Sequence, residues 1–179
     1  MTVTLSAAGP VSQQSRAEFE AFFDRHHREL GRLAYLLTGD RTAADDLAAD
    51  TFLAAWRQWD RVWSLDQPLA YVRRILVNLA ATRIRRLTRE RSRLSLFHVS
   101  DRDAPAGPDG AAVLDVRAAL GRLPARRRAC VVLRHALDLS EAEVAQILGI
   151  SVGTVKSQTS KGVAQLQKQL GPGIAGGLL

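Results

Sequence analysis

Apolar residues recur at intervals of three or four positions through most of the 179-residue chain, and this spacing is that of amphipathic helices. Three such stretches fill the first half, from Arg16 to Leu37, from about Ala43 to Trp59, and from Pro68 into a run of arginines. No alternating run of strand length competes with them. We therefore predict an all-α protein that begins with a compact helical bundle.

The composition changes sharply near the middle of the chain. Residues 100–110 are rich in Asp, Pro and Gly and almost devoid of apolar side chains, which is typical of a flexible linker. Helical spacing then resumes, so we predict two small helical domains joined by this linker. The expected divisions are a disordered N-terminus over 1–15, a helical domain over 16–93, a linker over 94–112, a helix-turn-helix domain over 113–170 and a flexible tail over 171–179.

Residues 140–162 have the pattern of a helix-turn-helix. Ser140 and Glu143 predict a capping box, Gly149 permits a tight turn, and Ser151 is expected to cap the second helix. The residues expected in the small core of the motif are Val144, Leu148, Ile150 and Val155. The residues that the second helix would present to DNA are Ser151, Gly153, Thr154, Lys156, Ser157, Gln158 and Lys161.

The charge is unevenly distributed as well as strongly positive. A formal net charge of +7 favours polyanionic partners, with nucleic acid first among them. Aspartates gather between residues 40 and 60, whereas arginines dominate residues 83–93. A protein that only bound DNA would have little use for the acidic zone, so two surfaces of opposite sign indicate two different partners.

The sequence contains no arrangement of residues that is typical of an enzyme active site. Its four histidines are not arranged with Cys or Glu at metal-ligand spacing, and no glycine-rich phosphate loop is present. Asp45 and Asp46 are adjacent, so on a helix their side chains diverge. We therefore expect no catalytic residues, no metal and no cofactor.

Two further features bear on chemistry and location. Cys130 lies in an apolar helical stripe and is interpreted as a small buried hydrophobic residue, with a redox-sensing role as the alternative. The N-terminus has no signal-peptide pattern, and no apolar stretch is long enough to span a bilayer. We therefore expect a cytoplasmic protein without membrane insertion.

Four segments, in the expected order over residues 16–170, resemble the extracytoplasmic-function (ECF) group of sigma factors. Asp45–Trp56, which reads DDLAADTFLAAW, resembles the polymerase-binding segment of that family. Pro68–Asn78, with the arginines that follow it, resembles the helix for the minus-ten promoter element. Leu120–Arg128 and Ile150–Gln158 resemble the C-terminal domain of that family. The segment Lys156–Gly162, which reads KSQTSKG, is most similar to the SigE-like branch.

The resemblance implies a non-enzymatic sigma factor that binds core RNA polymerase and directs promoter recognition and DNA melting. The polymerase contacts would be the clamp helices of the largest subunit and the flap. The residues implied for the clamp helices are Asp45, Asp46, Leu47, Asp50, Thr51, Phe52 and Trp56. The residues implied for the minus-ten element are Trp63, Tyr71, Arg73, Arg74, Asn78, Arg83, Arg85 and Arg86. Asp46→Arg and Phe52→Ala are expected to weaken polymerase binding and to leave the fold largely intact.

The helix from Ser151 would read the minus-thirty-five element as duplex DNA. Gln158 and Thr159 stand where many family members have Arg and an apolar residue, which leaves the base preference open. Anti-sigma inhibitors are common in this family, so such a partner also stays open. The alternative function is a stand-alone helix-turn-helix regulator with an N-terminal sensing or dimerisation bundle, which would not need the acidic helix.

Overall fold

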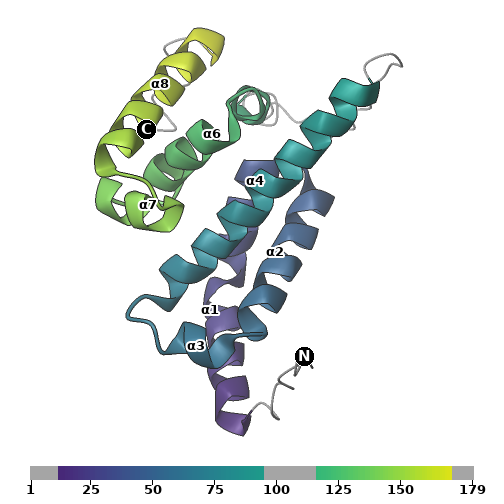
Figure 1. Cartoon of the computed structure of the whole chain (residues 1–179), viewed down its shortest axis with the longest axis vertical. Coiled ribbons are helices and arrows are strands. Elements are labelled where there is room, and N and C mark those ends of the chain that lie inside the picture. The colour runs from purple at the N-terminus through teal and green to yellow at the C-terminus, as the bar shows by residue number, and fades with distance from the viewer. Residues whose placement is uncertain (1–11, 95–115, 171–179) are drawn as a thin grey trace, which may run out of the picture.

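The computed structural model describes residues 12–94 and 116–170. Within these ranges the chain forms helices joined by short turns, without a strand, which confirms the predicted all-α class (Figure 1). A long N-terminal group of helices lies beside a smaller C-terminal group. Residues 1–11, the segment 95–115 and the tail 171–179 lie outside the described residues, together with the expectations placed on them.

The first helix, α1 (Gln13–Thr38), begins before the position that its apolar stripe indicates. Ser12 caps it by accepting a hydrogen bond from the Ser15 backbone N–H. The buried Ser15 hydroxyl donates to Asp60 Oδ1 at 2.6 Å and so ties the start of α1 to a later helix. The expectation of disorder over 1–15 is therefore wrong for residues 12–15, because a side-chain cap and a long-range bond hold them.

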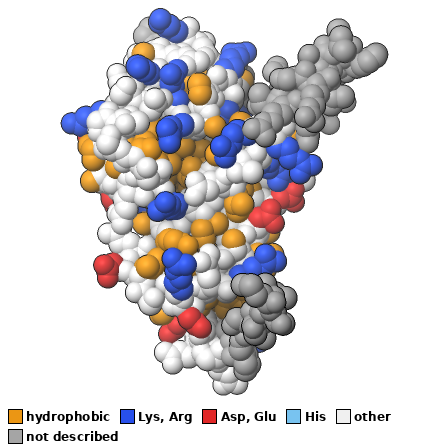
Figure 2. Space-filling model, in the orientation of Figure 1, with side chains coloured by type: hydrophobic (Ala, Val, Ile, Leu, Met, Phe, Trp, Pro, Cys, Tyr) orange, Lys and Arg blue, Asp and Glu red, His pale blue; other side chains and the backbone are white. Residues whose placement is uncertain are grey.

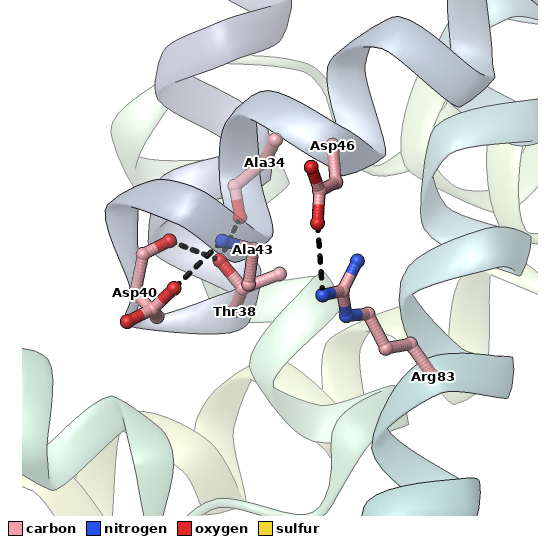
Figure 3. A network of polar contacts seen from close by, with 6 residues as sticks. All are labelled: Ala34, Thr38, Asp40, Ala43, Asp46 and Arg83. Carbon is pink, nitrogen blue, oxygen red and sulfur yellow. Dashed lines mark hydrogen bonds and ion pairs between the residues drawn. The ribbon is translucent and has the colours of Figure 1, made fainter.

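A tight turn joins α1 to α2 (Arg41–Trp56) and fixes the angle between them (Figure 3). Gly39 has a φ of 75° and its N–H bonds the Tyr35 carbonyl, which is a left-handed helix end of the kind glycine favours. Asp40 then caps α2 by accepting from the Ala43 N–H at 2.6 Å. The helix starts slightly earlier and ends earlier than the predicted span from Ala43 to Trp59.

A short helix, α3 (Trp59–Trp63), lies between α2 and the long helix that follows. The long helix α4 (Pro68–Leu94) then begins at Pro68, as predicted from the preference of proline for the first helical turn. The core that these helices enclose is aliphatic and aromatic. Its buried members include Phe22, Leu30, Leu33, Leu37, Leu47, Phe52, Trp59, Val62, Val72 and Leu76.

The second domain packs several shorter helices together. Residues 116–121 are helical and precede α6 (Ala125–Val131), a π-helical turn η1 (Val132–Ala136), α7 (Glu141–Leu148) and α8 (Val152–Leu170). The chain changes from α-helical to the wider π spacing at Val132. Asp138, with a φ of 50°, lies in the turn that follows.

Gly162 permits the close approach of α8 to α6. A Cβ atom at this position would lie 2.4 Å from Val131 Cγ2 and 3.0 Å from Arg127 Cγ. Both distances are shorter than carbon atoms normally tolerate, so any side chain at residue 162 must push the two helices apart.

We expect Gly162→Ala to destabilise the protein because of this overlap. Gly153, on the same helix, has open space where a Cβ would lie, with no atom within 4 Å, so Gly153→Ala is the matched control and gains the same helical preference without a clash. The free energies of unfolding of the two variants should differ by about 1–3 kcal/mol, as measured by urea denaturation. Equal stabilities would show that α6 and α8 are not packed in this way.

Candidate nucleic-acid interface

The exposed side of α2 combines acidic side chains with one apolar residue. Asp46, Asp50 and Leu53 follow each other at intervals of four and three positions, so they share one face of the helix. Both aspartates are exposed, as is the neighbouring Asp45, and Leu53 is 47% exposed. We call these four residues the acidic face of α2. Leu53 was missed from the sequence, although its spacing from the two aspartates is the signal that could have found it.

Other residues implied for polymerase binding point into the bundle instead. Leu47 and Phe52 are buried, and the Thr51 hydroxyl donates to the Leu47 carbonyl at 2.7 Å within the core. Trp56 is half-buried against Phe19, with ring centroids 4.8 Å apart. These residues pack α2 against the rest of the bundle, and their side chains leave little surface for a partner to contact.

The burial of Phe52 corrects the expectation that Phe52→Ala leaves the fold largely intact. The ring is 7% exposed and contacts both Phe19 and Phe23 edge-on or tilted. Truncating a buried phenylalanine costs about 3–5 kcal/mol of folding free energy. Loss of binding by this variant would therefore report on folding as much as on an interface.

The residues implied for the minus-ten element divide into groups with different surroundings. Two of the arginines on α4 are paired with carboxylates of the same domain. Arg73 donates from Nε and Nη2 to Glu29 Oε1 at 2.8 and 2.6 Å, and the pair is largely buried. Arg83 donates to Asp46 Oδ2 at 3.3 Å, across to α2 (Figure 3). The first pair anchors α4 to α1, whereas the second is exposed and contributes little to stability.

The remaining minus-ten candidates offer accessible groups. Arg74, Asn78, Arg85 and Arg86 are exposed along α4, and Tyr71 is half-buried with its hydroxyl donating to Gln58 Oε1 at 3.3 Å. Trp63 is 44% exposed and lies nearly parallel to buried Trp59, with ring centroids 5.4 Å apart. The Trp63 ring is thus held in place by the Trp59 ring, close to the start of α4, which carries several arginines. Rigid aromatic surfaces beside arginines can stack on unpaired bases while the arginines contact phosphates.

The helix-turn-helix has the predicted caps and turn. Ser140 Oγ accepts from the Glu143 N–H while Glu143 Oε2 accepts from the Ser140 N–H at 2.7 Å, so the capping box is present. Hydrogen bonds from Ser140 lower the pKa of Glu143 below its ordinary value. Gly149 has a φ of 63°, and Ser151 accepts from the Thr154 N–H at the start of α8.

The core of this motif differs slightly from the predicted one. Val144 and Val155 are buried as expected, but Leu148 and Ile150 are only half-buried, and Ile147 is buried instead. The first helix of the motif is therefore turned so that Ile147 points inward.

The start of α8 presents the polar side chains that the sequence predicts for DNA. Ser151, Gly153, Lys156, Ser157 and Lys161 are exposed, while Thr154 and Gln158 are partly covered. Lys156 Nζ lies 3.5 Å from Glu141 Oε2, an exposed pair across the motif. Figure 2 shows Lys and Arg side chains spread over the part of the molecule that the second domain occupies, with few acidic side chains on that face. This arrangement fits contacts to phosphates and base edges in a major groove.

The reactive side chains of the described residues show no constellation for metal chemistry. No group of three or more His, Cys, Asp or Glu side chains within residues 12–87 and 116–170 is placed to hold a metal ion. Cys130 is fully buried, and burial raises the pKa of its thiol to about 11, so the thiol stays protonated. Burial lowers the pKa of His26 and of His135. The helices in the described part of the chain include none long and apolar enough to cross a membrane.

Comparisons with known proteins point to one family. Residues 22–90 match the family model described as Sigma-70 region 2, and residues 114–166 match that described as Sigma-70, region 4. The chain is 34% identical to the ECF RNA polymerase sigma factor SigM of Mycobacterium tuberculosis, over 87% of this chain and 79% of that protein. It is 30% identical to the RNA polymerase sigma-E factor of Streptomyces coelicolor, over 86% of each chain.

Solved structures agree with the sequence relatives. The sigma factor RpoE from Bartonella quintana, in complex with the anti-sigma factor NepR, is similar with a TM-score of 0.73 and 27% identity, covering 87% of this chain and 98% of RpoE. CnrH, in complex with the cytosolic domain of CnrY, gives a TM-score of 0.62 at 27% identity, covering 88% of this chain and 92% of CnrH.

Proposed function

Since the chain belongs to the ECF group of the sigma-70 family, we propose that it directs RNA polymerase to promoters through three separate surfaces on α2, α4 and α8. Promoter recognition and transcription initiation follow from membership of the family. The assignment of residues to the three surfaces is our proposal. We also propose that the protein acts in the cytoplasm, where core polymerase and the chromosome are found.

The observation that carries the assignment is the separation of charge among the helices. The acidic face of α2 is exposed and offers a negative surface, which DNA would repel but a positively charged protein surface would attract. Leu53, at the C-terminal end of this face, supplies an apolar contact of the kind that stable protein interfaces place beside charges. We assign this face to the clamp helices of the largest polymerase subunit, with the flap as the partner of the second domain.

The second surface is the exposed side of α3 and α4. Trp63 would stack on an unpaired base of the minus-ten element, while Arg74, Asn78 and Arg85 would contact the neighbouring bases and phosphates. Arg73 is paired with Glu29 of α1 in a partly buried position, so we assign it the role of anchoring α4. A base captured outside the duplex offsets part of the free energy of melting.

The third surface is the first half of α8, which would enter the major groove of the minus-thirty-five element. The stand-alone regulator considered as an alternative accounts for this helix equally well. It does not account for a first domain that matches Sigma-70 region 2 over residues 22–90. We therefore favour one protein that reads two promoter elements while bound to polymerase.

Lys161 should contribute a phosphate contact in this third surface. We expect Lys161→Ala to reduce the magnitude of the slope of log binding constant against log salt by about 1, because one fewer counterion is released. Lys168→Ala, an exposed lysine in the last turn of the same helix, is the matched control and should leave the slope unchanged. Titration of a short fluorescent duplex at several salt concentrations measures both. Equal slopes for the two variants would remove Lys161 from the interface.

Site-specific photocrosslinking tests the three assignments together. A photoreactive side chain at Asp50, Asn78 or Ser157 would be introduced into the full chain, and complexes with core polymerase and promoter DNA would be irradiated. We expect Asp50 to label the largest subunit, Asn78 the melted minus-ten strand and Ser157 the minus-thirty-five duplex. Labelling of DNA from Asp50, or of neither promoter element from the other two positions, would contradict the assignment.

Two solved relatives are described in complexes, RpoE with the anti-sigma factor NepR and CnrH with the cytosolic domain of CnrY. By extension, we propose that an anti-sigma factor also restrains this protein. Such an inhibitor would act by occupying the acidic face of α2, the minus-ten side of α4, or both.

A further inference from the structure

The first residue of α8 is an apolar side chain that the fold leaves in solvent. Val152 is 40% exposed, and within residues 116–170 it is the one large apolar side chain that the structure leaves exposed. It is not among the residues that pack against the core, whereas Val155, three positions later, is fully buried. Folding therefore gives no reason for an apolar residue at position 152.

Hydrogen bonds fix the backbone on both sides of Val152. Ser151 Oγ accepts from the Thr154 N–H at 3.2 Å and lies 2.8 Å from Thr154 Oγ1. The Val155 N–H donates to the Ser151 carbonyl at 3.0 Å. Valine has one strongly preferred rotamer in a helix, because its two methyl groups branch at Cβ. The methyl groups of Val152 are therefore held in a defined direction, so a partner that contacts them orders little that is not ordered already.

The next residue, Gly153, is also unexplained by the fold. Glycine is among the least favourable residues inside a helix, so its presence there usually has a packing reason. At Gly162 the reason is α6, since a Cβ there would lie 2.4 Å from Val131 Cγ2. At Gly153 a Cβ would meet no atom within 4 Å, and the residue is exposed. The missing side chain instead leaves the backbone of the first turn open to close approach by a partner.

The proposed function supplies the partner that approaches this turn. When a recognition helix enters the major groove, its N-terminal residues contact the edges of the bases. The C5-methyl of thymine is the apolar group that the bases present in that groove, and apolar side chains contact it. The exposed side chains that follow, those of Lys156 and Ser157, offer hydrogen bonds instead. Val152 is thus the side chain of this surface whose chemistry matches a methyl group.

We propose that Val152 recognises a thymine of the minus-thirty-five element by contact with its C5-methyl group, and that Gly153 lets the helix approach closely enough for this contact. This inference rests on the proposed function and adds a specificity-determining residue to its third surface. Val152 then selects thymine over cytosine at one position, because cytosine lacks the methyl group. Contacts to phosphates provide no such selection, because they are the same for every sequence.

Removal of one methyl group from the DNA tests the contact directly. Uracil pairs as thymine does and lacks only the C5-methyl group. On a promoter fragment that the protein selects with core polymerase, each thymine of the minus-thirty-five element, on either strand, is replaced in turn by uracil. The Kd of the full chain, bound to core polymerase, is measured for each fragment by fluorescence anisotropy. We expect one replacement to weaken binding about fourfold, as the loss of one buried methyl-sized contact does.

Val152→Ala should bind the thymine and uracil fragments equally at that position, because it lacks the two methyl groups that make the contact. Val163→Ala, farther along the same helix, is the matched control and should retain the difference. The cycle of two proteins and two bases separates the contact from any effect of uracil on the duplex itself. The proposal is overturned if no thymine shows the difference, if Val152→Ala retains it, or if the selected element contains no A·T pair.

Gly153→Ala tests the close approach independently. Gly31→Ala, on α1, is the matched control, because a Cβ at either position would meet no atom within 4 Å. Both substitutions favour their helices to a similar extent. We expect only Gly153→Ala to weaken promoter binding, by about fivefold or more, as an added methyl group in a packed contact does. Equal promoter binding by the two variants would contradict a close approach of DNA to the first turn of α8.

The same fragments distinguish a failure of this contact from a failure of the proposed function. If the unmodified protein forms no promoter complex with core polymerase, the proposed function is wrong, and the assignment of Val152 is wrong with it. If the complex forms and initiates but uracil is tolerated in place of every thymine, the three surfaces stand and Val152 does not read the minus-thirty-five element.

Discussion

Asp46→Arg should weaken binding to core RNA polymerase by about 2 kcal/mol, which is roughly thirtyfold in Kd. The substitution places a positive charge on the acidic face of α2, which is proposed to meet a positively charged surface of the partner. Asp46 is exposed, so the substitution creates no cavity in the core. Fluorescence anisotropy of the labelled protein, titrated with core polymerase, measures the effect.

Two controls separate this effect from simpler causes. Glu20→Arg changes the net charge equally and also breaks an exposed pair, with Arg16, but lies on α1. Arg83→Ala removes the partner of Asp46 without altering the acidic face. Both variants should bind core polymerase nearly as the unmodified protein does. If Arg83→Ala were as defective as Asp46→Arg, Asp46 would act by positioning Arg83 and not by contacting polymerase.

Trp63→Ala should impair promoter melting at saturating core polymerase. The exposed ring is held against Trp59 and is the aromatic surface assigned to an unpaired minus-ten base. Stacking of a base on an aromatic side chain contributes about 1–3 kcal/mol, so formation of the melted complex should fall by roughly 5- to 150-fold. The fluorescence of 2-aminopurine placed in the minus-ten element measures this step directly.

Trp63→Phe is the matched variant because it keeps a ring at the same position. It should recover much of the melting that Trp63→Ala loses, and the affinity of α8 for duplex DNA should not change in either variant. Thermal unfolding of both proteins checks that the packing on Trp59 is not the cause. Normal melting by Trp63→Ala would mean that another group captures the base.

Much of the fold could be predicted because local sequence signals and tertiary packing agree there. Pro68 starts α4, Gly39 and Gly149 end helices with positive φ, and the capping box of Ser140 and Glu143 forms as its spacing indicates. The predicted start of α1 lies too far along the chain. The true start is stabilised by a hydrogen bond from Ser15 to Asp60, 45 residues away. Periodicity contains no information about such a contact.

The candidate sites were harder to predict for a related reason. A motif resemblance covers every residue of a helix, whereas burial depends on how that helix is rotated in the bundle. Leu47, Thr51 and Phe52 therefore share a motif with Asp46 and Asp50 but face the core, and Leu53 faces outward. The carboxylate partners of Arg73 and Arg83 come from other helices and could not be assigned from spacing alone.

The contact between the domains was not foreseen at all. It joins residues far apart in the sequence, such as Leu37 and Arg128, through a backbone carbonyl that no side-chain pattern reveals. A flexible linker was predicted between the domains, and such a linker is compatible with both packed and separated arrangements. The structure supplies the packed one.

Run-off transcription with purified core polymerase on a library of promoter fragments tests the central claim most directly. The account predicts transcripts that require this protein and that start downstream of a shared motif in two blocks, near minus ten and minus thirty-five. Initiation should be lost with Asp46→Arg and reduced with Trp63→Ala. Absence of any factor-dependent transcript, while the protein still binds both core polymerase and duplex DNA, would contradict the account.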